Sequence, residues 1–122
     1  MNAPDSIPVD RFQHKEMAAG RWWTLSIFEQ LGNIGSEISR ALKWKGRNPA
    51  LSQGAVVRAL ELFDLTLADP RYRASVARLR EIARAREVFL DFAIGSNQYQ
   101  STQENLQRWF DQFAIAAQRT RR

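Results

Sequence analysis

Two dipeptides in the middle of the chain, Asn48-Pro49 and Asp69-Pro70, constrain its fold more than any other feature. Asparagine and aspartate are favoured helix N-caps, and proline is favoured at the first helical position. Each dipeptide therefore predicts the start of a helix. We expect one helix over residues 49–68 and another over residues 70–94, with Gly95 as the C-terminal stop of the latter.

Apolar residues recur at helical spacing in two further segments. Ser26 and Glu29 have the spacing of a capping box at the start of the first segment, and Gly46 follows its end. Ser101 and Glu104 have the same spacing at the start of the last segment. We therefore expect a helix from residue 24 or 26 to residue 45 and a helix over residues 101–118. The stripe of the first comprises Ile27, Leu31, Ile34, Ile38, Ala41 and Leu42.

No segment shows the alternation of a strand, so we predict an all-α fold. Four helices joined by short connections are typical of an antiparallel up-down four-helix bundle. The 122 residues suit one domain. We assign residues 21–118 to the bundle, residues 1–20 to a flexible or partly helical leader, and residues 119–122 to a basic tail. Small residues on one flank of the first helix, including Gly32 and Gly35, predict close approach of another helix, from this chain or from a second subunit.

The sequence lacks the motifs of several common activities. It has no cysteine, no glycine-rich phosphate loop and no histidine cluster for a metal, and its one histidine, His14, lies in the leader. We therefore expect no metal, no cofactor and no catalytic residue. No apolar run reaches the roughly 20 residues that span a bilayer, so we expect a cytoplasmic protein without a membrane partner.

Arg86 is the charged residue that is hardest to place on a solvated surface. On a helical wheel of about 100° per residue it falls on the apolar face between Leu79, Ala83, Leu90 and Ala93. A charge buried there needs a carboxylate, and we expect Glu37 to supply it. Other polar residues lie on the same side of the first predicted helix as Glu37, or on the narrow polar edge of the second predicted helix. The predicted buried constellation comprises Arg86, Glu37, Asn33, Glu29, Asp64 and Glu61, the last two being alternative partners of Arg86.

The net charge of +5 favours acidic partners, nucleic acid first. Fifteen of the 18 basic residues are arginines, which bind phosphate bidentately, although codon bias explains that ratio equally well. Contacts to nucleic acid would be made mostly to phosphates and would weaken with salt. The candidate binding residues lie on the outward face of the third helix and in the tail: Arg73, Arg80, Arg84, Arg119, Arg121 and Arg122.

Residues 22–118 carry segments that resemble small bacterial helical-bundle proteins without a characterised activity, among them LSIFEQLGNIGSEISRALKWK at 25–45, RALELFDLTLADPR at 58–71 and GSNQYQSTQENLQRWFDQFA at 95–114. In size, helix count and charge the chain is also similar to the 23S rRNA intervening-sequence proteins and to the accessory variability proteins of retroelements. The latter resemblance implies ring oligomers that bind a reverse transcriptase and nucleic acid. The Arg-x4-6-His signature of HEPN ribonucleases is missing, which argues against a nuclease.

The leading hypothesis is a non-enzymatic bundle, an accessory or adaptor subunit that self-associates and binds a protein partner, RNA or DNA through its arginines. One alternative is a small enzyme or nuclease-like toxin whose pocket is built from Glu29, Asn33, Glu37 and Arg86. The other is a purely structural subunit or a partner of the toxin–antitoxin type.

Overall fold

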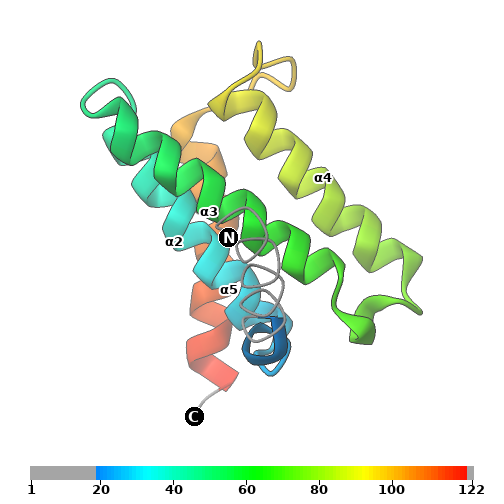
Figure 1. Ribbon diagram of the computed structural model, residues 1–122. Coiled ribbons are helices and arrows are strands. Elements are labelled where there is room, and N and C mark those ends of the chain that lie inside the picture. The colour runs from blue at the N-terminus through cyan, green and yellow to red at the C-terminus, as the bar shows by residue number, and fades with distance from the viewer. Residues whose placement is uncertain (1–18, 121–122) are drawn as a thin grey trace, which may run out of the picture.

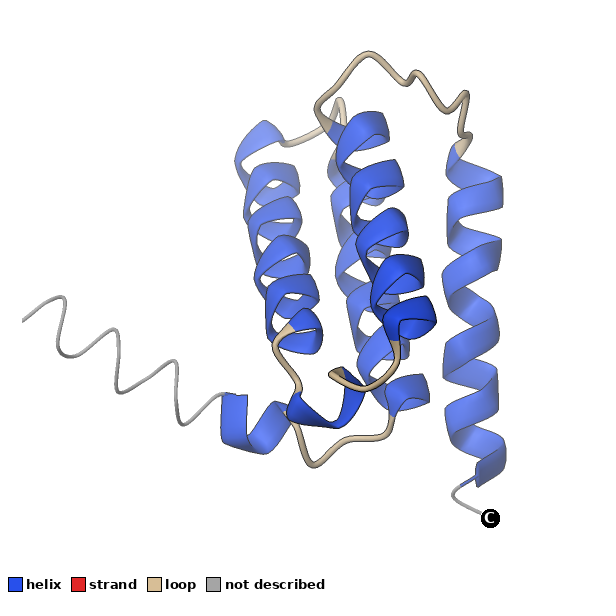
Figure 2. Ribbon diagram, turned by 90° about the vertical axis from the view of Figure 1, so that its right-hand side faces the viewer, coloured by secondary structure: helices blue, strands red, loops and turns tan. Residues whose placement is uncertain are grey.

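The computed structural model describes residues 19–120, and this part of the chain is helical, with no strand (Figure 2). Its long helices are α2 (Ile27–Trp44), α3 (Pro49–Leu67), α4 (Val76–Ala93) and α5 (Gln103–Thr120). A helical turn at residues 19–22 precedes them, and the 3₁₀ helix η1 (Pro70–Tyr72) joins α3 to α4. The all-α prediction is confirmed. Among residues 19–120, no helix is both long and apolar enough to cross a bilayer.

Some sequence predictions concern residues outside that range. The predicted leader covers residues 1–20, of which residues 1–18 lie outside the described residues, as do Arg121 and Arg122 of the predicted tail. Residues 19 and 20 belong to the helical turn that precedes α2. Arg119 is described, and it belongs to α5, which continues to Thr120. The last helix is therefore two residues longer than the segment that we assigned to the bundle.

The predicted starts of α2 and α3 are confirmed by their caps. Ser26 Oγ accepts a hydrogen bond from Glu29 N at 3.1 Å, and Glu29 Oε1 accepts one from Ser26 N at 3.0 Å. Asn48 Oδ1 accepts from Leu51 N at 3.2 Å, directly ahead of Pro49. α2 ends two residues before Gly46, whose φ of 81° lies in the left-handed region that suits glycine.

The prediction of one continuous helix from Pro70 onward is wrong. The Asp69 carboxylate caps only the short helix η1, because Oδ1 accepts from Arg71 N at 3.0 Å and Arg73 N then bonds to Pro70 O in 3₁₀ fashion. A second cap begins α4, where Ser75 Oγ accepts from Arg78 N at 3.2 Å. The predicted helix is thus a 3₁₀ turn, a corner and an 18-residue α-helix.

The start of α5 also lies one residue beyond the predicted capping box. Ser101 belongs to the preceding loop, because its N–H and its carbonyl are both bound by the side chain of Asn97. Thr102 and Asn105 form the reciprocal cap instead, with both hydrogen bonds at 3.0 Å. The capping geometry is therefore of the predicted kind, but other residues supply it.

The helices pack unevenly around the core. α2 lies along both α3 and α5, whereas α4 packs against α3 (Figure 1). Phe63 of α3 joins the two sides, since its ring centroid lies 6.4 Å from that of Phe89 and 6.1 Å from that of Phe110. All three phenyl rings are fully buried. α4 and α5 themselves share few close approaches, so the helical assembly is open along this one seam.

The small flank of α2 is occupied by α5 of the same chain. A Cβ added to Gly35 would lie 2.8 Å from Phe110 Cβ, and one added to Gly32 would lie 3.2 Å from Ala114 Cα. No side chain larger than hydrogen fits at Gly35 without movement of α5. The close approach that we predicted for these glycines is therefore made within the chain.

Candidate functional site

The predicted pairing of Arg86 with Glu37 does not form. Arg86 Nε lies 3.0 Å from Asp64 Oδ1, so the alternative partner is the one that is bound. The pair is not buried, because 30% of the Arg86 side chain and 61% of the Asp64 side chain are exposed. The interior face of α4 is formed by Ile82, Ala85 and Phe89, which places Arg86 at the edge of that face, beside α3.

The rest of the predicted constellation is dispersed along α2 and α3. Glu37 Oε2 lies 3.2 Å from Arg40 and its Oε1 lies 3.3 Å from Arg58, both of which are exposed. Asn33 donates to the backbone carbonyl of Glu29, whose side chain belongs to the cap of α2. Glu61 is exposed on α3. The Glu37 side chain itself is only 14% exposed, so its ion pairs are half-buried. These residues nevertheless belong to separate ion pairs and a helix cap, and they are not brought together in one pocket.

A different set of residues forms the buried polar cluster of the protein. Gln30, Thr66 and Asp69 are each fully buried, although the sequence predicted only a capping role for Asp69 and did not single out the other two. Asp69 Oδ2 accepts from Arg71 Nη2 at 2.6 Å and from Gln30 Nε2 at 3.0 Å. Arg71 Nη2 also donates to the carbonyl of Leu25 at 2.6 Å. One guanidinium thereby joins η1 to the segment that leads into α2.

Two aromatic residues complete this cluster. Tyr72 OH donates to Gln30 Oε1 at 2.6 Å. Trp22 Nε1 donates to Thr66 Oγ1 at 2.8 Å, and that hydroxyl donates to Leu62 O at 2.8 Å. Buried polar groups cost free energy unless they are hydrogen-bonded, and here each is bonded to another part of the chain. We name Trp22, Gln30, Thr66, Asp69, Arg71 and Tyr72 the basal network.

The electrostatics of the basal network favour a charged Asp69. Burial alone would raise the pKa of this carboxyl, but the hydrogen bonds from Arg71 and Gln30 outweigh burial and hold its pKa below the ordinary value. The hydrogen bond to Asp69 in turn raises the pKa of Arg71. Burial raises the pKa of Tyr72. The network therefore holds a fixed ion pair and a neutral phenol, which is an architecture for fixing chain segments in place.

The predicted arginine face is solvent-exposed where the structure describes it. Arg73 follows η1, and Arg80 and Arg84 lie one turn apart on α4; all three are exposed. None of them takes part in an ion pair within residues 19–120, whereas Arg40, Arg58, Arg71 and Arg86 each do. The guanidinium of Arg84 lies 5.9 Å from the centroid of the Tyr99 ring, which is also exposed. Arg119 is exposed near the end of α5.

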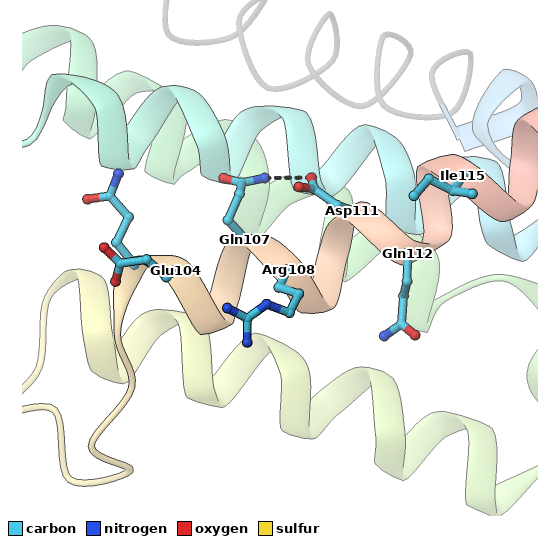
Figure 3. Close-up of a pocket in the computed structure, with 7 residues that line it drawn as sticks. Glu104, Gln107, Arg108, Asp111, Gln112 and Ile115 are labelled. Atoms are coloured by element: carbon cyan, nitrogen blue, oxygen red, sulfur yellow. Dashed lines mark hydrogen bonds between the residues drawn. The ribbon is translucent and has the colours of Figure 1, made fainter.

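Figure 3 shows a shallow depression on the outer surface of α5. All of its lining residues come from this single helix, and Gln107 donates to Asp111 within it at 2.9 Å. One helix supplies no opposing wall, so this surface does not enclose a ligand. The view does reveal Arg108, an exposed cation on this outer surface of α5 that sequence reasoning missed.

A groove with two walls runs between α4 and α5. Its upper part has a volume of about 450 Å³ and its lower part about 190 Å³, and Glu81 and Trp109 line both. Ala85 and Val88 form the α4 wall of the upper part, opposite Leu106 and Phe110. The repeat of apolar residues along α5 predicts its core stripe, but it could not show that α4 stands away from that helix.

Over the part of the chain that the structure describes, no group of three histidine, cysteine, aspartate or glutamate residues is placed to hold a metal ion. No family model, no curated protein and no solved structure matches the chain. The resemblances to bacterial bundle proteins therefore stay expectations. What the fold and the surface define is a class: an all-helical protein with an arginine face and a groove beside it.

Proposed function

We propose that this protein is a non-enzymatic accessory protein that binds nucleic-acid phosphates through Arg73, Arg80 and Arg84. The observation that carries the proposal is that these three exposed guanidinium groups lack a carboxylate partner within residues 19–120. An arginine already paired with a carboxylate must give up that partner to bind a phosphate. An unpaired arginine pays no such cost and can form a bidentate contact.

The geometry of α4 supports contact with an extended backbone. Arg80 and Arg84 are separated by one helical turn, and Arg73 precedes the helix on the corner after η1. Nearby acids interrupt the face, since Glu81 and Glu87 lie on the same helix. The proposal therefore predicts contacts with phosphates and no reading of bases. As part of the same proposal, the four long helices form an antiparallel bundle. The protein is proposed to act in the cytoplasm, where nucleic acid is present.

The alternative of an enzyme pocket receives no support from the geometry. Its four residues were Glu29, Asn33, Glu37 and Arg86, and they belong to a helix cap, a side chain-to-backbone hydrogen bond and two separate ion pairs. The alternative of a protein partner is supported by a different surface, the groove between α4 and α5.

A titration with labelled nucleic acid tests the proposal. Fluorescence polarisation of a generic single-stranded RNA and a generic DNA duplex would be measured at low and at high salt. We expect binding at low salt that weakens steeply as salt rises. Changing Arg73, Arg80 and Arg84 together to glutamine should weaken binding and reduce the salt slope by about 1 for each lost contact.

A charge-matched variant provides the control. Changing Arg40, Arg47 and Arg58 together to glutamine removes the same charge from exposed positions away from α4. This control should bind nearly as well as the unaltered protein. Absence of binding at low salt, or equal weakening by both triple variants, would contradict a specific role for the arginine face.

A further inference from the structure

The groove between α4 and α5 is long enough for a helix. Its α4 wall extends from Arg78 in the lower part to Val88 in the upper part. Ten residues of α-helix rise about 15 Å, or nearly three turns. The groove lies along the seam where the two helices share few close approaches, so its walls are helix flanks that no other element of residues 19–120 covers.

The floor and walls are mainly apolar. Trp109 stands at the centre, and Phe113, Ile82 and Leu31 continue the apolar lining into the lower part. Exposed Phe28 lies at the lower end, with 37% of its surface accessible. An apolar groove between two helices is the surface that binds the apolar face of an amphipathic helix.

The polar residues at the upper end are engaged with the backbone of the chain. Asn105 accepts from Thr102 N through its side chain, and the backbone of Ser101 is bound by Asn97. A site for a small polar ligand needs a few polar groups that converge on it. The upper end instead uses these groups to begin α5, which favours an apolar occupant over a small polar one.

The charge along the rims is predominantly positive. Arg78 and Arg84 line the groove from α4, where Glu81 is the one acid of the lining. The α5 wall adds no charged residue to the lining, so two arginines stand against one acid. Complementary charges steer association and disfavour partners of like charge. The rims therefore match a helix whose flanks carry carboxylates.

From these features we infer that the groove between α4 and α5 is a docking site for an amphipathic helix with acidic flanks, supplied by a protein partner. The apolar face of that helix covers Trp109 and Val88, and its carboxylates meet Arg78 and Arg84. This inference goes beyond phosphate binding by the arginine face and does not depend on it, because the groove walls that carry it are apolar.

The test uses a fluorescein-labelled peptide of leucine, alanine and glutamate, about 18 residues long so that it can form a helix in water. A second peptide has lysine at every glutamate position. Polarisation titrations with the full chain should show binding of the acidic peptide at least tenfold tighter than binding of the lysine peptide. The variant Val88→Asp should weaken binding of the acidic peptide at least tenfold.

Two further variants separate docking from misfolding. Arg78→Glu changes an exposed residue of the groove lining, so the protein should stay folded while its preference shifts toward the lysine peptide. Val57→Asp adds the same charge as Val88→Asp at a valine of α3 that is 55% exposed and outside the groove lining, and it should bind the acidic peptide normally.

Three results would overturn the inference. The first is equal binding of the two peptides, or binding that Val88→Asp and Arg78→Glu leave unchanged. The second is self-association of the protein that Val88→Asp abolishes, which would make a second copy the occupant. The third is RNA binding that Val88→Asp abolishes. Failure of the arginine-face proposal alone would look different, because RNA binding would be absent while the acidic peptide still bound.

Discussion

Tyr72 donates a 2.6 Å hydrogen bond to Gln30 Oε1 in the protein interior, joining η1 to α2 across 42 residues of sequence. Gln30 is fully buried and Tyr72 is nearly so. The Gln30 amide nitrogen donates to Asp69 and to the Trp22 carbonyl. The Gln30 amide oxygen accepts its hydrogen bond from the Tyr72 hydroxyl. Several measurable properties of the protein depend on this arrangement.

Replacing Tyr72 by phenylalanine should lower the free energy of unfolding by about 1–3 kcal/mol, because it leaves the buried Gln30 oxygen without its donor. Urea denaturation followed by circular dichroism measures this change. Tyr99→Phe is the matched control, since Tyr99 is 43% exposed and its change should stay within about 0.5 kcal/mol. Equal effects at the two tyrosines would show that the hydrogen bond to Gln30 contributes nothing.

Asp69 should make the protein sensitive to acid. Its folded pKa lies below the unfolded value of about 3.9, so its contribution to stability is complete above that pH and is lost as the pH falls through the folded pKa. Denaturation midpoints measured between about pH 7 and pH 3 should therefore drop more steeply for the unaltered protein than for Asp69→Asn.

Asp64→Asn is the comparison for that pH series. The Asp64 side chain is 61% exposed, so its removal should leave the acid dependence nearly as it was. If Asp69→Asn loses stability in acid as steeply as the unaltered protein, the acid sensitivity comes from other carboxylates and the prediction is wrong.

The ion pair between Arg86 and Asp64 should be weak. A double-mutant cycle with Arg86→Met and Asp64→Asn should give a coupling energy of at most about 1 kcal/mol, as for other exposed pairs. A buried pair would cost about 3–5 kcal/mol when broken from one side. A coupling energy clearly above about 1 kcal/mol, together with a loss of about 3–5 kcal/mol in either single variant, would contradict a weak, exposed pair.

Gly35→Ala and Gly54→Ala should change stability in opposite directions. Alanine favours a helix interior by up to about 1 kcal/mol over glycine. At Gly54 the added methyl meets only the flexible end of Arg58, at 3.4 Å, so the propensity gain should appear. At Gly35 it meets Phe110 Cβ at 2.8 Å, and overpacking should cost about 1–3 kcal/mol. Thermal unfolding of the two variants checks the signs, and stabilisation by both would contradict the tight contact of α2 with α5.

Local signals in the sequence predicted most of the helical structure. The capping box at Ser26 and the start at Asn48 depend on residues three apart, so they could be recognised without tertiary information. Asp69 looked like the same kind of signal. It became the centre of the basal network because its side chain binds Gln30, which lies 39 positions earlier in the chain.

The position of Arg86 shows why the predicted site failed. A helical wheel shows how the residues are arranged around α4, but it does not show which other helices pack against each side of it. Phe63 packs against Phe89, which turns Ile82 and Ala85 inward and leaves Arg86 at the edge beside α3. The groove could not be predicted from the sequence for the same reason, since the separation of α4 from α5 depends on packing between distant segments.

The seam between α4 and α5 also determines how the protein comes apart. α2 has a helix on either side, whereas α4 has α3 as its main helical neighbour. Opening α4 therefore exposes less packed surface than opening α2, and regions with few packed neighbours open with the lowest free energy. The backbone amides of α4 will exchange with deuterium before those in the middle of α2. The helix that carries Arg80 and Arg84 is thus the one that can detach while the α2–α3–α5 core stays folded.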